Sequence, residues 1–279
     1  MRRTQHHLQK KRYPAGRGLR RALGLVCFMA ALYLLTTGVK GFFTPGTQEQ
    51  QIAQPGVTLS PQQDVSDTLV LPKRTFYTIQ LGAYAGLDAA RSQAAAYTGR
   101  GAAGYILEDD KFRVLASAYT TQEDAMTIQK RLENQGISAY IYILQTDEVE
   151  LRITATADQQ TAIQNIFSFV EGAMQEIGAC SLALDKQTMT ADAIISRMET
   201  LYAQGDSLKK KLLRLVPGGS DGVVDSMLSL LETTQNAISS VKTQNSQDSL
   251  AMASKIKYNY LDVLCNYVRF NQSILASMG

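Results

Sequence analysis

A pattern of strands and helices within residues 75–146 constrains the fold of this chain more than any other part of its sequence. Four short segments there are rich in alternating apolar, β-branched and aromatic residues, and two segments between them have helical spacing. The predicted strands span residues 76–84, 105–108, 112–119 and 138–144, and the predicted helices span residues 87–98 and 122–134. The order β-α-β-β-α-β forms one four-stranded antiparallel sheet with both helices on one face. We therefore expect an α+β module with strands 76–84 and 112–119 at its centre and the other sheet face open.

The N-terminal part of the chain combines a basic segment with an apolar run. Residues 1–21 contain eight Lys or Arg and no Asp or Glu, and residues 22–39 contain no charged side chain. An uncharged run of about 18 residues is at the short end of a membrane-spanning helix, and basic residues before it favour a cytoplasmic N-terminus. We interpret residues 1–21 as a cytoplasmic tail and residues 22–39 as the transmembrane helix of a single-pass membrane protein, with the C-terminal domains extracytoplasmic. A cleaved secretory signal is the alternative interpretation.

The segment between the apolar run and the module has the composition of a linker. Residues 40–74 contain four of the six prolines of the chain together with many Gln, Thr, Ser and Gly, and they show no helical or strand period. This composition predicts a flexible tether that would hold a folded domain above the membrane.

The last part of the chain, residues 147–279, contains four stretches with apolar residues at helical spacing and a break at residues 217–219. Such stretches predict an all-α helical bundle after the module. We interpret their apolar stripes as core, and a face for a protein partner or for self-association is the alternative. Cys180 and Cys265 also lie here and are interpreted as small buried residues, although they could instead form a disulfide outside the cytoplasm.

Three segments of the module resemble the SPOR domain family. They are YTIQLGAY (77–84), KFRVLASAY (111–119) and YIYIL (140–144). The residues that match the family pattern are Gln80, Gly82, Ala83, Tyr84, Phe112, Arg113, Val114 and Tyr119, whereas Ser117-Ala118 replaces the usual Gly-Pro. The resemblance implies binding to peptidoglycan glycan strands stripped of their stem peptides, at division or spore septa.

The resemblance also implies which residues contact the glycan. In the family the open sheet face binds the sugar, and the positions that match are Gln80 and Arg113 and, more weakly, Ala83 and Lys111. Tyr84, at the end of the first strand, is a further candidate, either for stacking on the ligand or for packing.

The alternation within the strands agrees with this assignment in part. Gln80 and Arg113 fall on the polar side of their strands, away from the predicted helices, and an amide and a guanidinium suit the hydroxyl and acetamido groups of a sugar. Two alternatives remain at this point. Gln80 could be an ordinary solvated strand residue, and Arg113 could be a cross-strand partner of Glu108 or of another acid.

The sequence argues against several classes of function. Its two histidines, His6 and His7, lie in the basic segment, so the remainder cannot form a His-ligated zinc site or a Ser-His-Asp triad. Without residues 1–21 the chain keeps 20 basic and 25 acidic residues, which gives no basic surface for nucleic acid. Residues 111–119 also lack the glycine of an RNA-recognition strand. We therefore expect no catalytic residue, no metal, no cofactor and no nucleic-acid partner.

These observations favour a membrane-anchored, noncatalytic cell-envelope protein that binds peptidoglycan glycan strands in cell division or sporulation. An envelope scaffold that acts mainly through its C-terminal helical bundle is the alternative. A wall hydrolase could work with two carboxylates alone, but Asp109-Asp110 has the character of a hairpin turn.

A reporter fused after Gly279 is expected to be active only outside the cytoplasm, because the eight basic residues precede the apolar run. Activity of paired periplasmic-type and cytoplasmic-type reporters at this position tests the orientation. A C-terminal fusion that is active in the cytoplasm would contradict it.

Overall fold

The computed structural model describes residues 64–216 and 222–278. The expected cytoplasmic tail (1–21), the expected transmembrane helix (22–39) and most of the expected linker therefore lie outside the described residues. Within the part that is described, no helix combines the length and the apolar character needed to cross a membrane.

The predicted four-stranded sheet is present with the predicted element order. Its elements are β2 (Arg74–Tyr84), α2 (Leu87–Thr98), β3 (Tyr105–Glu108), β4 (Phe112–Tyr119), α3 (Gln122–Asn134) and β5 (Tyr140–Thr146). The strand order is β3-β4-β2-β5, and all neighbours are antiparallel. The expectation that β2 and β4 are the central strands is thus confirmed.

The helices α2 and α3 cover one face of this sheet through two clusters of apolar side chains. Ile79 of β2 lies in one cluster with Ile128 of α3, and Val114 of β4 lies in the other with Ala90 and Ala94 of α2. Ile79 and Val114 are both fully buried, as expected for alternate residues of a central strand.

Two further strands extend the sheet's β2–β5 pair toward the helical region. β1 (Val65–Leu71) pairs with β6 (Val149–Ala155) in antiparallel register, with Leu71 opposite Val149, close to where Arg74 of β2 lies opposite Thr146 of β5. This finding corrects two predictions: residues 65–71 are not linker, and residues 149–155 are not helix. The physical reason is the alternation in β6, which turns Val149 and Leu151 toward the core while Glu150 and Arg152 stay exposed.

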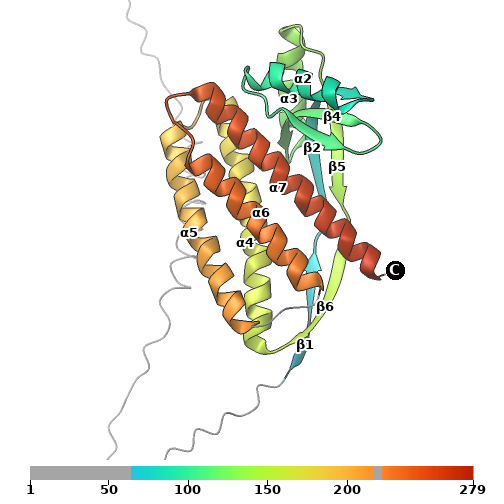
Figure 1. Ribbon diagram of the computed structural model, residues 1–279, viewed down its shortest axis with the longest axis vertical. Coiled ribbons are helices and arrows are strands. Elements are labelled where there is room, and N and C mark those ends of the chain that lie inside the picture. Colours follow the sequence, from blue (N-terminus) through green and yellow to red (C-terminus); the bar gives the residue numbers. More distant parts are fainter. Residues whose placement is uncertain (1–63, 217–221, 279) are drawn as a thin grey trace, which may run out of the picture. The chain divides into compact units, whose positions relative to one another are not determined.

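The remaining C-terminal residues form four long helices, as predicted. These are α4 (Ala157–Asp185), α5 (Ala191–Leu215), α6 (Gly222–Lys242) and α7 (Ser249–Met278). Figure 1 shows them side by side, and α4 contacts both α5 and α7. Cys180 and Cys265 are buried free thiols in this region and do not form a disulfide.

The sheet face opposite α2 and α3 is not fully open, because α7 crosses it. On that face Thr78, Tyr105, Leu115 and Ala118 are each at most 6% exposed, and α7 contacts β3, β4 and β5. The ring of Tyr105 lies against that of Tyr258 of α7, with 5.3 Å between centroids. The expectation of a wholly open face is therefore wrong, and the core of the helical region continues into the sheet.

A buried carboxylate at the end of α4 joins the helices to the rest of the sheet module. Asp185 accepts hydrogen bonds from the Tyr119 hydroxyl (2.9 Å) and lies 2.7 Å from the Lys257 ammonium of α7. The side chains of Asp185 and Lys257 are only 8% and 11% exposed. Lys257 also donates to the carbonyl oxygen of Gly101 at 3.1 Å.

The Asp185→Ala variant is expected to lower the free energy of unfolding by about 3 kcal/mol or more, because it leaves the Lys257 ammonium buried without its counter-ion. Urea denaturation of the full chain measures the change. Asp88→Ala is the control, since it removes the exposed Asp88–Arg91 pair of α2, and it should leave the stability nearly unchanged. Equal stability of the two variants would show that the buried pair does not hold the helices to the sheet.

Candidate functional site

The helix α7 leaves one corner of the sheet face accessible. We call this surface the sheet corner, and we define it by Gln80, Ala83, Arg113, Tyr140 and Tyr142 together with the turn at residues 109–111. Ala83 and Tyr140 are exposed, and the other three side chains are partly exposed.

Strand register explains why these residues come together. Arg113 of β4 lies opposite Ala83 of β2, and Gln80 of β2 lies opposite Tyr140 of β5. Directly opposed residues in an antiparallel pair share a face. The β2–β4 register is irregular on either side of Gln80, and Leu81 has no partner on β4. Leu81 packs in the cluster under α3, and the extra residue brings Ala83 onto the same face as Gln80, opposite Arg113.

Arg113 is the centre of the polar contacts at this corner. Its guanidinium donates to the Asp109 carboxylate at 2.7 Å and to the Gln80 amide oxygen at 3.1 Å, and it also donates to Asp110. The same group lies over the Tyr142 ring, 4.6 Å from its centroid. The Tyr142 hydroxyl donates in turn to Asp109 at 2.8 Å. This network fixes the Arg113 side chain, which is only 16% exposed, in one position.

The charges of this network are stabilised in their ionised forms. Burial raises the pKa of Asp109, but hydrogen bonds from Arg113, from the Lys111 amide and from Tyr142 outweigh it and hold that pKa well below its usual range. The hydrogen bond to Asp109 raises the pKa of Arg113. Burial, and then the hydrogen bond to Asp109, raise the pKa of Tyr142. At neutral pH Arg113 and Asp109 therefore form an ion pair, and the Tyr142 hydroxyl keeps its proton and donates it in the hydrogen bond to Asp109.

A comparison with protein-family models matches residues 73–143 to the SPOR domain. The chain contains a SPOR domain. No curated protein and no solved structure matches the chain in the corresponding comparisons. The match supports a role in peptidoglycan binding related to cell division. Among the described residues, no group of three His, Cys, Asp or Glu side chains could hold a metal ion.

The structure places four of the five candidate glycan contacts at the corner of the SPOR domain. Gln80, Ala83 and Arg113 share the accessible face, and Lys111 is exposed in the adjoining turn. The Arg113 side chain pairs with Asp109 and Asp110 of that turn and not with Glu108. Because both aspartates belong to the turn beside the sheet corner, these ion pairs keep Arg113 at the corner.

Tyr84, the fifth candidate, lies on the other face of the SPOR domain. Its ring packs with Ala94 and Val114 beneath α2. The ring also lies over Gly82, where an added Cβ would be 2.5 Å from the Tyr84 hydroxyl oxygen. Gly82 is thus needed for the packing of Tyr84, which favours packing over ligand stacking for this side chain.

Two tyrosines of the corner were not among the sequence-based candidates. Tyr140, which is 61% exposed, and Tyr142 lie two residues apart on β5 and point to the same face as Gln80. The alternation of Tyr140 and Tyr142 with Ile141 and Ile143 indicates that both tyrosines lie on one face of β5. The sequence does not show whether helices cover that face, so it could not identify the tyrosines as accessible. An exposed ring beside fixed polar groups offers the combination of apolar surface and hydrogen bonds that a sugar ring requires.

The pH dependence of stability tests the electrostatics of the corner. Because the folded-state pKa of Asp109 lies below the unfolded value of about 3.9, its contribution to stability is present above that pH and is lost as the pH falls below it. The Asp109→Asn variant should therefore lose less stability than the parent between pH 5 and the acid limit of about pH 2. Thermal denaturation across this range measures the difference, and parallel curves for the two proteins would contradict the network.

Proposed function

We propose that this protein is a membrane-anchored, noncatalytic component of the cell envelope that binds peptidoglycan glycan strands, stripped of their stem peptides, at the sheet corner of its SPOR domain. The process it serves is cell division or sporulation. The observation that carries the proposal is the fixed Arg113–Gln80 pair beside the exposed ring of Tyr140, on a segment that matches the SPOR family.

The chemistry of the corner suits a neutral or weakly acidic saccharide. Gln80 accepts from Arg113, so its amide nitrogen can donate to a ligand. Lys111 is exposed at the turn and can reach a carboxylate. Tyr140 offers a ring face for the apolar side of a sugar. The same corner lacks a titratable pair arranged for hydrolysis, because Asp109 is held as an ion pair by Arg113.

Membrane anchoring by residues 22–39 is part of the proposal and is supported by the sequence pattern alone. A second role, as a scaffold, is supported by the outer position of α5. This helix of 25 residues buries only Ile194, Met198, Gly205 and Leu212, and Leu213 on it is 49% exposed. A protein partner or a second copy of the chain would contact this helix.

The double variant Gln80→Ala with Arg113→Ala is expected to bind peptide-free glycan about tenfold to a few hundredfold more weakly than the parent, because it removes directed hydrogen bonds, one of them from a charged group. Binding of the full chain to sacculi, before and after amidase treatment, measures the change. The full chain is used because β1, β6 and α7 share a core with the SPOR domain.

Two variants serve as controls for this experiment. Arg91→Ala alters an exposed side chain of α2, on the other side of the sheet, and should bind like the parent. Ile79→Ala should lose binding through lost core packing, at a cost of about 2–5 kcal/mol in the free energy of unfolding. A double variant that is folded and binds as well as the parent would show that the sheet corner is not the glycan site. Release of soluble muropeptides by the parent would show that the protein is an enzyme.

A further inference from the structure

A cleft lined by apolar and polar side chains lies between the SPOR domain and the helical region, away from the sheet corner. Its volume is about 660 Å³. It is lined on one side by the end of α2 and the loop between α2 and β3, and on the other by the end of α6, the connection between α6 and α7, and the first half of α7. This volume is in the range of roughly 300–1,000 Å³ that small-molecule sites have. The polar side chains on this side of the cleft come from α6, from α7 and from the connection between them, and are those of Ser240, Gln244, Asp248, Ser254, Lys255, Tyr258 and Asn259.

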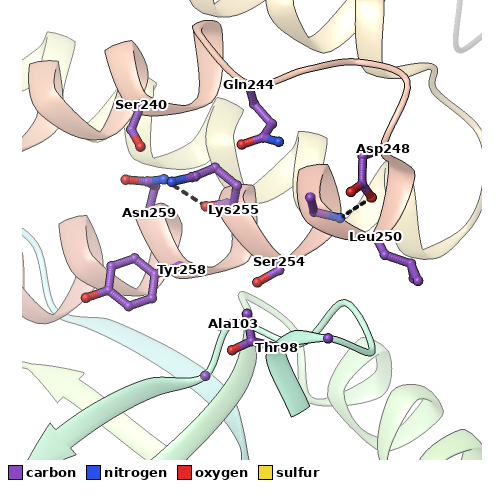
Figure 2. A pocket seen from close by; sticks show the side chains of 13 residues that line it. Thr98, Ala103, Ser240, Gln244, Asp248, Leu250, Ser254, Lys255, Tyr258 and Asn259 are labelled. Atoms are coloured by element: carbon purple, nitrogen blue, oxygen red, sulfur yellow. Dashed lines mark hydrogen bonds between the residues drawn. The ribbon is translucent and has the colours of Figure 1, made fainter. Parts of the chain in front are cut away.

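Several of these polar groups have no partner within the described part of the chain. The side chains of Ser240, Gln244 and Ser254 make no hydrogen bond there, and the Lys255 ammonium makes no ion pair. Asn259 donates to the carbonyl oxygen of Lys255 at 2.8 Å, which leaves its own amide oxygen free. Figure 2 shows Gln244, on the connection between α6 and α7, and Ser254, on α7, on one side of the cleft, with Thr98 at the end of α2 on the other side. These donors and acceptors are therefore available to a ligand.

The wall opposite the helices is held in a fixed position. Gly104 has a positive φ of 62°, and a Cβ at this position would clash with Thr98 Oγ1 and lie 3.0 Å from the carbonyl oxygen of Ala94. Thr98 Oγ1 donates to that same carbonyl oxygen at 2.8 Å. The ammonium of Lys257 holds the loop to α7 through the Gly101 carbonyl oxygen. This wall of the cleft is thus held in place by its own packing and hydrogen bonds.

One end of the cleft carries an aromatic ring and a cation. The Tyr258 ring is tilted by 59° against Tyr105 and remains 44% exposed. Lys255 lies one turn earlier on α7, and the nearby carboxylate of Asp248 accepts the backbone N–H of Ala251 at the start of the helix. The lining therefore combines apolar surface, including Leu250 and the Tyr258 ring, with amides, hydroxyls, the Asp248 carboxylate and one ammonium group that makes no ion pair among the described residues.

We propose that this cleft is a second saccharide site, which takes an N-acetylated sugar that bears a carboxylate. Lys255 would bind the carboxylate, Gln244 and Asn259 would bind hydroxyl or acetamido groups, and Tyr258 would contact the sugar ring. The inference rests on the proposed function, because N-acetylmuramic acid in a peptide-stripped glycan strand has a free lactyl carboxylate. With two sites, one protein could hold two segments of glycan.

The chain contains no tryptophan, so a single introduced indole reports on one site. Tyr258→Trp reports on the cleft, and Tyr140→Trp reports on the sheet corner. Each full-length variant is titrated with the peptide-free disaccharide of N-acetylglucosamine and N-acetylmuramic acid, and with N,N′-diacetylchitobiose, which lacks the carboxylate. We expect a saturable fluorescence change in both variants with the first sugar.

Lys255→Gln added to Tyr258→Trp should raise the Kd for the carboxylated disaccharide roughly tenfold, whereas it should hardly change the Kd for chitobiose. Lys211→Gln on α5, which is exposed and outside the cleft, is the charge-matched control and should have no effect. Arg113→Ala should raise the Kd measured with Tyr140→Trp about tenfold or more and leave the Kd measured with Tyr258→Trp unchanged. Calorimetry of the parent and of Lys255→Gln repeats the comparison without an indole.

Two results together would overturn the cleft proposal. The first is a folded Tyr258→Trp variant whose fluorescence does not change with either sugar, and the second is a calorimetric Kd that is the same for the parent and for Lys255→Gln. If Tyr140→Trp then still responds, the proposed function stands without a second site. A response at Tyr258→Trp alone supports the cleft and contradicts the sheet corner. No binding of either sugar to any variant or to the parent would overturn both proposals.

Discussion

The packing of α7 across the sheet determines both the core of this protein and the shape of its accessible surface. Leu115 and Thr78, at the centres of β4 and β2, are fully buried on the face that α2 and α3 do not cover. Burial of this apolar surface stabilises the contact between helix and sheet. The same contact restricts the accessible part of the face to the corner around Arg113. The helical region therefore decides which residues of the SPOR domain can meet a ligand.

The sheet and the helices are joined in two further ways. β1 and β6 extend the sheet's central and edge strands along α4, and Leu71 and Val149 belong to the same core cluster as the helices. Asp185 connects α4 with Tyr119 of the sheet and with Lys257 of α7. The described residues, 64–216 and 222–278, accordingly belong to one compact unit. Removal of the helices would expose Leu115, Leu71 and Val149 to water, so binding measurements require the full chain.

The local pattern of the sequence was sufficient for the sheet and for the four helices. The alternation in residues 77–84 and 112–119, the glycines after residues 87–98 and 122–134, and the apolar stripes of residues 157–278 mark those elements independently of the rest of the chain. The β1–β6 pair was missed because each strand depends on a partner about 80–90 residues away in the sequence. Prolines on both sides of residues 65–71 suggested a linker, and the alternation in residues 149–155 is short and precedes a long helix.

The site was predictable to the extent that strand alternation fixes its geometry. Gln80 and Arg113 were placed on one face because each lies on the polar side of a central strand. Tyr140 and the cleft beside Tyr258 depend on where α7 lies, and an apolar stripe along a helix does not specify which surface it covers. The register irregularity next to Gln80 could not be predicted from the sequence of β2 either, since it arises from the pairing of β2 with β4.

The central claim is that the sheet corner, and not the helix-covered face, binds peptide-free glycan. A crystal structure of the full-length protein bound to a peptide-free tetrasaccharide of peptidoglycan tests it most directly. The account predicts sugar density in contact with Gln80, Arg113 and the Tyr140 ring, with α7 still in place over Leu115. Sugar density between α2 and the sheet, or a displaced α7 with sugar over Leu115 and Thr78, would contradict it.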